Sequence, residues 1–432
     1  MCISKSKSPV IMEVIRLVNY PPVNLNSDEN GDPKTGTFAG VQRGRISSQS
    51  QKAALRNSDF FRNLDIDYRT RMIPSMVASR LISEYDVPEE YAQSIKEQLA
   101  RIARKKAKDA DSSDESSAEE DDSMDTTAKD KKSSKRGVSK KAGSNDDEDS
   151  KGKTQLLMLS AAEFDALVTA VFKMYQKNPS EKNLNLNDLR DQARKIAQEN
   201  PKRITASMAM MGRMSTKGSD FIPDIDGALS CAHAITTHEV ELEEDFFTAH
   251  DDAFGLNLVS HDEIQTPTAH LGSRWYNSAC YYEFYALDID TFKKNLNGHN
   301  DMKDYLKASI RAFLEAAFYT HPSAGRHKWA GDVTPEVFMV QMRNRKIYTN
   351  LVNAYQVPVD SHSNIVEESV KRLTDEVNRT DKKCDVPVVH RAYWAFHYDN
   401  IKPEKCDGFD NIRDLIDKCV EWIMEEQLNE AD

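Results

Sequence analysis

Apolar residues recur with two different periods along the 432-residue chain, and these periods predict where helices and strands lie. Residues Ile11 to Tyr20 are typical of a strand, which we expect to end at Pro21 and Pro22 because proline cannot donate to a sheet ladder. Helical spacing is clear in "LSAAEFDALVTAVFKMYQK", where Ser160 and Glu163 form a capping box. The apolar stripe of this helix is expected to be core and consists of Phe164, Leu167, Val168, Val171, Phe172 and Tyr175.

Strands and helices are mixed in the second half of the chain. The stretches "SCAHAITTHEVELEED" and "CYYEFYALDID" are rich in β-branched and aromatic residues and predict strands. Further helices are expected over Asn187–Asn200, Met302–Tyr319, Ser363–Asn378 and Asn411–Leu428, the last with Asp410 as its cap. Because strands and helices do not alternate regularly, the sequence predicts an α+β fold.

One segment, from Arg104 to Lys153, consists almost entirely of Ser, Asp, Glu, Lys, Ala and Gly. It has no aromatic residue and carries its charges in blocks, so it cannot bury enough apolar surface to offset chain entropy. We predict a disordered low-complexity insertion at 104–153, more typical of a solubilising linker than of a nucleic-acid contact.

Composition narrows the class of protein. The six cysteines are scattered without a C-x-x-C pair, which argues against a zinc ribbon or disulfide framework and favours a reducing cytoplasm. No signal peptide and no run of about 18 apolar residues is visible, so we expect no membrane partner. The net charge of −12 disfavours nonspecific attachment to nucleic acid over the whole surface but leaves room for a local basic groove.

The stretch "GRISSQSQKAALRNS" is where such a groove is expected. Ser48 and Gln51 predict a capping box at the start of a helix, whose unpaired first-turn amides attract anions. Gly40 and Gly44 precede it, together with Arg43 and Arg45, and one face of the helix carries Gln49, Lys52 and Arg56. On this pattern alone the stripe is either a solvated basic face or a seat for polymer phosphate, since no nucleotide-binding glycine motif is present.

Other candidate chemistry is weaker. The histidines between His233 and His270 lie among many carboxylates, but no H-E-x-x-H or C-x-x-C spacing supports a metal site, and we expect neither metal nor cofactor. No G-x-S-x-G elbow occurs, so no catalytic residue is assigned. The methionines of "ASMAMMGRMSTKG" have two interpretations: they fill gaps in the core, or Met214 beside Arg213 wedges against a base. Leu271, in a turn-like segment, is a further apolar side chain that could project from the surface.

Several strings occur in an order that carries a family resemblance: "RISSQSQKAALR", "GRMSTKG", "DIDGALSCAHAITTHEV", "DFFTAHDD" and "TAHLGS". With the opening "VIRLVNYPPVNLN", they make the chain resemble the CRISPR-associated backbone (crRNA-binding) subunit of the type I-E Cascade surveillance complex, from about Met12 to Asp290. The resemblance implies an RRM-like (ferredoxin-like) palm, helical fingers and a thumb β-hairpin. The implied boundaries are palm 11–60, fingers 61–215 containing the insertion, a return to the palm at 216–230, thumb 231–273, and remaining palm with C-terminal helices at 274–432.

The resemblance also implies a function without chemistry. Copies of the subunit stack head to tail on the spacer of a crRNA, flip bases at intervals, and present the guide for pairing with target DNA. Further partners would be a guide-processing endoribonuclease subunit, a small subunit and a large subunit.

The resemblance also assigns site residues. By matching position, Ser47, Gln49, Lys52 and Arg56 would contact guide phosphates. Arg45 is added because it belongs to the same basic stretch. Met214 and Leu271 would frame the displaced nucleotide, with Arg213 nearby. Ser27 and Ala53 stand where the family can have basic residues.

Two alternatives remain from other classes. Related type III backbone subunits cut target RNA with a thumb aspartate, a role that Asp224, Asp226, Asp251 or Asp252 could be given. A free-standing RRM-type RNA-binding protein would be expected to carry an RNP motif, and no such string occurs.

Overall fold

The computed structural model describes residues 10–110, 156–180, 185–200, 203–214, 223–250, 268–296, 298–299, 301–322, 326–384 and 387–428. The chain divides into two compact units. The first comprises Met1–Ile66, Ile204–Arg213 and Ile225–Asp432, and the second comprises Asp67–Arg203 and Met214–Asp224.

The first unit is built on a sheet that has ten strands within the described residues. Its order is β12-β11-β10-β1-β9-β7-β3-β2, and β6 and β8 also pair with β9. Among these pairs only β11 with β12 is parallel. The strands are β1 (Ile11–Val23), β2 (Thr35–Phe38), β3 (Val41–Ile46), β6 (Leu229–Cys231), β7 (Ala234–Thr236), β8 (Glu243–His250), β9 (Thr268–Asp288), β10 (Val337–Arg343), β11 (Val388–Ala395) and β12 (Asp407–Gly408).

Strand β1 lies between β9 and β10, which explains its almost continuous run of buried residues. It continues through Pro21 and Pro22 to Val23, so its predicted end at Tyr20 is wrong by a few residues. The pairing with β9 shifts register between Tyr20 and Val23. Because the prolines have no N–H to donate, the ladder is interrupted there although the backbone stays extended.

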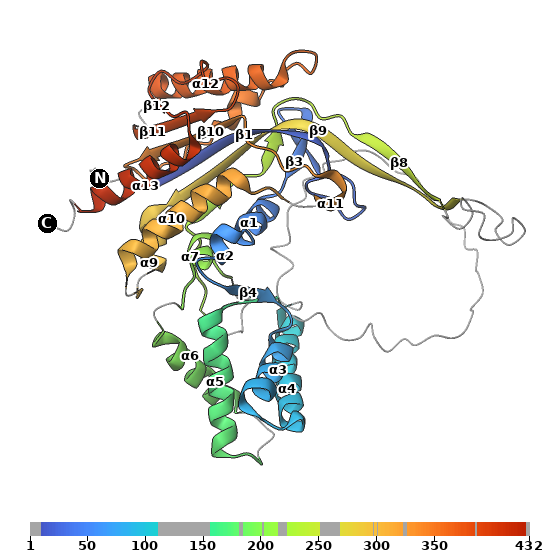
Figure 1. Ribbon diagram of the computed structural model, residues 1–432, viewed down its shortest axis with the longest axis vertical. Helices are drawn as coiled ribbons and strands as arrows, with labels where there is room; N and C mark the ends of the chain where they lie inside the picture. The colour runs from blue at the N-terminus through green and yellow to red at the C-terminus, as the bar shows by residue number, and fades with distance from the viewer. Residues whose placement is uncertain are drawn as a thin grey trace, which may run out of the picture. The chain divides into compact units, whose positions relative to one another are not determined.

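Helices cover both faces of this sheet (Figure 1). On one face α12 and the 3-10 helix η1 pack against alternate residues of β1, β9 and β10, such as Leu17, Phe284 and Met339. On the other face α10 packs beside α13, and its Phe313 and Phe318 contact Tyr285, Phe338 and Trp394. The helices of this unit are α1 (Ser48–Arg56), α2 (Asp59–Arg62), α7 (Ala206–Met211), α9 (Ile289–Asn295), α10 (Met302–Tyr319), α11 (Arg326–Trp329), η1 (Leu351–Tyr355), α12 (Ile365–Lys383) and α13 (Ile412–Leu428).

The first part of β9 leaves the body of the sheet and pairs with β8, forming a two-stranded arm (Figure 1). Gly272 lies opposite Phe247, and a Cβ on Gly272 would stand 2.6 Å from the Phe247 ring, so the ring lies directly over this glycine. Residues 251–267, which connect the two strands of the arm, lie outside the described residues.

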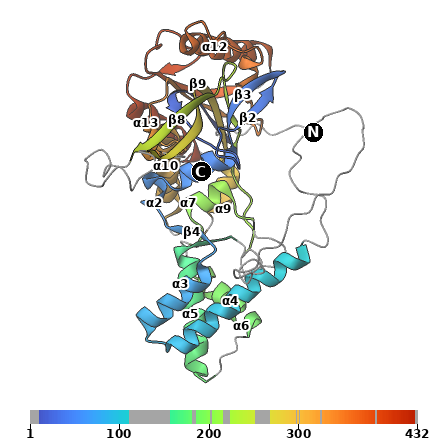
Figure 2. The ribbon, with the colours of Figure 1, turned by 90° about the vertical axis from the view of Figure 1, so that its right-hand side faces the viewer.

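The second unit is a helical bundle with a small two-stranded antiparallel sheet (Figure 2). Its elements are β4 (Asp67–Thr70), α3 (Ile73–Tyr85), α4 (Glu89–Ala110), β5 (Leu157–Ser160), α5 (Ala161–Lys177) and α6 (Leu186–Gln198). The predicted stripe of α5 is confirmed as core: Phe164, Leu167, Val168 and Val171 are buried, and Phe172 and Tyr175 pack against the same cluster.

The structure confirms the mixed α and β architecture with a mostly antiparallel sheet, the Ser160–Glu163 capping box and the helix over Met302–Tyr319. The expected Asp410 cap of α13 is wrong, because the Asn411 side chain accepts the hydrogen bond from the Arg413 amide. The predicted disordered segment begins too early, since α4 continues to Ala110, while 111–155 lies outside the described residues. The palm, fingers and thumb boundaries stay predictions.

Candidate nucleic-acid interface

Strand β3 leads directly into α1, and the turn between them fixes the start of the helix. The N-cap is Ser47, whose Oγ accepts a hydrogen bond from the Ser50 amide at 3.3 Å. The Ser47 amide is itself held by Oδ1 of Asn26 at 2.9 Å. The predicted cap at Ser48 is therefore wrong by one residue. Within the described residues the amides of Ser48 and Gln49 have no hydrogen-bond partner, which leaves a helix N-terminus suited to an anion.

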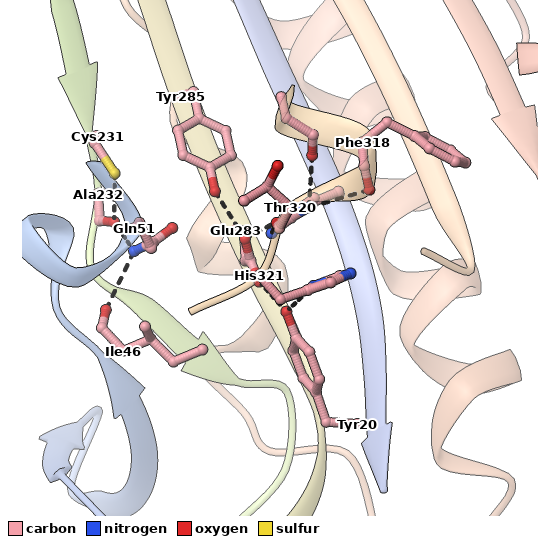
Figure 3. A network of polar contacts seen from close by, with 12 residues as sticks. Tyr20, Ile46, Gln51, Cys231, Ala232, Glu283, Tyr285, Phe318, Thr320 and His321 are labelled. Carbon is pink, nitrogen blue, oxygen red and sulfur yellow. Dashed lines mark hydrogen bonds and ion pairs between the residues drawn. The ribbon is translucent and has the colours of Figure 1, made fainter. Parts of the chain in front are cut away.

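Gln51 is buried instead of completing a capping box. Its Nε2 donates to the carbonyl oxygens of Ile46 at 3.2 Å and Ala232 at 2.9 Å, which ties α1 to the chain that enters β7 (Figure 3). With Ser47 as the N-cap, Ser50 is the third residue of the helix, so Gln51 lies one position beyond the capping-box site. Gln51 therefore anchors the helix and takes no part in its cap.

The polar stripe of α1 faces outward. Gln49 is exposed, while Lys52 and Arg56 are half-buried, so the stripe is partly packed against the protein. Burial lowers the pKa of the Lys52 ammonium from its ordinary value, an effect that nearby Cys231 partly opposes. A lysine with incomplete hydration gains more from a bound phosphate than a fully solvated one does.

Arg43 and Arg45 differ in accessibility although they are two residues apart. Arg43 is completely buried and donates to the carbonyl oxygens of Thr236 at 3.0 Å and Tyr355 at 2.9 Å. Arg43 is therefore engaged inside the fold and takes no part in an anion seat at the start of α1. Arg45 is half-buried, and its Nη1 contacts Nδ1 of His233 at 3.2 Å. Gly44, between them, faces the other side of β3 against Tyr281 and Thr236.

The residues expected to frame a displaced base lie in different surroundings. The Arg213 side chain is buried, and its backbone forms an antiparallel bridge with Ile225. Met214, which follows it, has 88% of its surface exposed. Leu271 is 66% exposed on the β8–β9 arm. Arg213 and Leu271 belong to the first unit and Met214 to the second.

Sequence reasoning missed Phe246, which is 68% exposed on the arm. The register pairs Phe246 with Ser273 and Thr248 with Leu271, so Phe246 and Leu271 share one face of the arm. The signal was the doubled aromatic in "DFFTAHDD": on a strand two adjacent phenylalanines point to opposite faces, and only one of them can cover Gly272.

The histidines of this region have separate environments. His238 is buried, with Nδ1 at 2.7 Å from the Glu239 carbonyl oxygen, and burial lowers its pKa. His233 is exposed. In the described part of the chain no three side chains of His, Cys, Asp or Glu gather as metal ligands. Asp224 and Asp226 are exposed, whereas Asp251 and Asp252 lie outside the described residues.

Comparison with models of protein families identifies the family of this chain. The model of the CT1975-like protein family, Cas_CT1975, matches residues 12–422. The chain belongs to this CRISPR-associated family. The resemblance inferred from the sequence is thereby confirmed at the level of the family. No curated protein matches the chain.

Solved structures share the fold over nearly the whole chain. A chain of a "CRISPR RNA-guided surveillance complex, pre-nicking" is similar with a TM-score of 0.71 and 20% identity, covering 96% of this protein and 100% of that chain. A chain of a second "CRISPR RNA-guided surveillance complex" has a TM-score of 0.62 and 18% identity, covering 95% and 99% respectively. No helix in the described ranges is both long and apolar enough to cross a membrane.

Proposed function

We propose that this CT1975-like protein is the backbone subunit of a type I-E Cascade surveillance complex. Several copies would bind head to tail along the spacer of one crRNA in the cytoplasm and present its bases for pairing with invading DNA. The observation that carries the proposal is the family membership together with a likeness, across 96% of the chain, to a chain of a CRISPR RNA-guided surveillance complex.

The β3–α1 unit would bind the guide by its phosphates. The unpartnered amides of Ser48 and Gln49 form an anion seat, to which Arg45, Gln49, Lys52 and Arg56 add polar and charged side chains. Ser47 would act through the cap that orients these amides, since its own hydroxyl is engaged. Phosphate contacts of this kind hold RNA of any sequence, and selection of the target is left to base pairing.

The arm and the exposed apolar residues are suited to displacing bases of the guide RNA from their stack. Under this proposal the first unit holds an RRM-like palm and the arm is the thumb, whereas the helical unit is the fingers. Met214, Leu271 and Phe246 are exposed side chains of the kind that wedge against an unstacked base. The remaining partners would be an endoribonuclease subunit that processes the guide, a small subunit and a large subunit.

The test is co-expression with a CRISPR guide and the partner subunits, followed by size-exclusion chromatography and nucleic-acid analysis. Wild type is compared with Lys52→Ala/Arg56→Ala and with a matched control, Lys371→Ala/Arg379→Ala, which removes the same charges from α12. We expect several copies on a discrete guide for wild type and control. The α1 variant should bind less RNA and show a shallower salt dependence, by about 1–2 in log–log slope. A monomer without RNA in the presence of all partners would overturn the proposal.

A cleavage assay on the same complex tests the absence of catalysis. We expect a labelled target RNA to stay intact in the presence of Mg²⁺. Cleavage that is lost in Asp224→Asn or Asp226→Asn would replace the binding role with that of an RNA-cutting subunit.

A further inference from the structure

Arg45 and His233 form a pair that the α1 stripe does not include. Arg45 lies on β3 opposite Ile235 of β7, and its Nη1 approaches Nδ1 of His233 to 3.2 Å. A guanidinium can only donate hydrogen bonds, so Nδ1 must be the acceptor in this contact. His233 is then neutral and carries its hydrogen on Nε2, on a side chain that is exposed.

Within the described residues, the charges that act on His233 are cationic. Besides Arg45 they include Lys34, whose carbonyl oxygen accepts from the Arg45 amide at 2.8 Å. Within the described residues no carboxylate lies within salt-bridge distance of Arg45, Lys34 or His233. Partial burial lowers the pKa of His233 from its ordinary value, and the positive charges of Arg45 and Lys34 lower it further. The cluster is cationic although the net charge of the chain is −12.

The guanidinium of Arg45 also lacks a complete set of partners. Its Nε is buried with no hydrogen-bond partner, and its stem packs against Gly36. In the described part of the chain its acceptor is a neutral imidazole, which attracts a guanidinium less than an anionic phosphate oxygen does, because only the phosphate brings an opposite charge. An anion arriving at this point would therefore displace the imidazole as the acceptor for Arg45.

We propose that Arg45 and His233 together bind one phosphate of the guide RNA, and that His233 takes up a proton from solvent as the phosphate arrives. The proposal rests on the proposed function, because it assumes that this face meets RNA. Arg45 transfers its hydrogen bond from Nδ1 of His233 to a phosphate oxygen, and Nε2–H of His233 donates to the same phosphate. The freed Nδ1 then accepts the proton, because a nearby negative charge favours the imidazolium.

The sign of the pH dependence follows from this exchange. Without RNA the pKa of His233 is below its ordinary value, and with RNA it is higher. Binding is strengthened as the pH falls through the higher pKa, and the gain is complete below the lower one. If RNA raises the pKa by one unit, the affinity at low pH exceeds that at high pH by about tenfold.

The test measures binding of the full-length chain to a fluorescein-labelled single-stranded RNA by anisotropy between about pH 5.5 and pH 8. Wild type is compared with His233→Asn, which can still accept from Arg45 but cannot titrate. His397→Asn is the matched control. His397 is an exposed histidine that pairs with Glu336 and follows β11, which lies towards the other end of the strand order from β3. We expect wild type and His397→Asn to bind more tightly at low pH, and His233→Asn to lose most of that dependence. Calorimetry in two buffers of different ionisation enthalpy should show proton uptake on RNA binding by wild type and by His397→Asn. His233→Asn should take up far fewer protons.

The outcomes separate the two proposals. RNA binding whose pH dependence is the same in His233→Asn as in wild type overturns the His233 proposal and leaves the backbone role intact. A wild-type chain that binds no RNA at any pH overturns both. Circular dichroism of each variant at both ends of the pH range distinguishes a lost contact from an unfolded chain.

Discussion

The Nε atom of Arg16 donates to Oε2 of Glu283 across 2.6 Å, and the two side chains are 1% and 0% exposed. Arg16 also donates to the Thr320 carbonyl oxygen at 3.1 Å, next to the end of α10. The hydroxyls of Tyr20 and Tyr285 donate to the same carboxylate (Figure 3). Burial on its own would lower the pKa of Arg16, but Glu283 and the neighbouring tyrosines raise it above its ordinary value. One buried ion pair therefore joins β1, β9 and the end of α10.

Glu283→Gln is expected to destabilise the protein strongly. The substitution keeps the shape of the side chain but leaves the Arg16 charge buried without a counter-ion. Breaking a buried pair from one side costs about 3–5 kcal/mol. Urea unfolding of the full-length chain, followed by circular dichroism, measures the change in the midpoint.

The matched control is Glu367→Gln on α12, which removes a carboxylate from an exposed pair with Lys371. Exposed helix pairs contribute little to stability because solvent and salt screen them, so the midpoint should hardly move. Equal effects of the two substitutions would show that the Arg16–Glu283 pair does not hold the first unit together.

Two adjacent serines at the start of α1 should respond differently. Ser47→Ala removes the Oγ that accepts from Ser50, at an expected cost of about 1 kcal/mol, and weakens RNA binding by loosening the first turn. Ser48→Ala should leave stability nearly unchanged, because within the described residues the Ser48 hydroxyl donates only to the exposed Gln49 side chain. Chemical unfolding and RNA anisotropy on the two variants measure both effects. A larger loss from Ser48→Ala would restore the cap that the sequence alone predicts.

The position of the α1 N-cap shows which details of the structure the sequence alone cannot predict. Periodicity located helices such as Met302–Tyr319 because their cores repeat locally. Whether Gln51 caps the helix or enters the core depends on the Ala232 carbonyl, which is 181 positions away in the chain. The same limit applies to Arg43, whose acceptors Thr236 and Tyr355 come from distant segments.

The candidate site was predictable to a similar degree. The anion-binding character of the β3–α1 unit follows from local residue types, and the structure brings Arg45 and the start of α1 together as consecutive parts of the chain. The contact between Arg45 and His233 was not predictable, since it depends on the pairing of β3 with β7. Nor could spacing alone show that Phe246 shares a face with Leu271, because that follows from the register of β8 on β9.

Thiol reactivity should separate the cysteines by burial. Burial raises the pKa of Cys280 to about 12, and likewise that of Cys231 to about 12 despite the opposing effect of Lys52. Raised values leave almost no thiolate at pH 8, and the thiolate is the nucleophile. Cys384 is exposed. Among the cysteines of the described residues, iodoacetamide on the native protein should therefore modify Cys384 first, and Cys231 and Cys280 only after denaturation, as read by peptide mass spectrometry. Early labelling of Cys280 would show that the packing between the sheet and α12 opens in solution.

Gly44→Ala is expected to disturb the strand that leads into α1. A Cβ at Gly44 would clash with the Tyr281 hydroxyl and lie 2.9 Å from Cγ2 of Thr236, both of them buried. Overpacking of this kind costs about 1–3 kcal/mol, and any shift of β3 is transmitted to the anion seat that follows it. Gly408→Ala is the control, since its Cβ would meet only the flexible end of Lys402 at 3.5 Å. Thermal unfolding should give a clearly lower Tm for Gly44→Ala alone, with weaker RNA binding. Unchanged stability would mean that β3 can move away from β7 at little cost, and the placement of Arg45 beside His233 would then be no fixed feature of the fold.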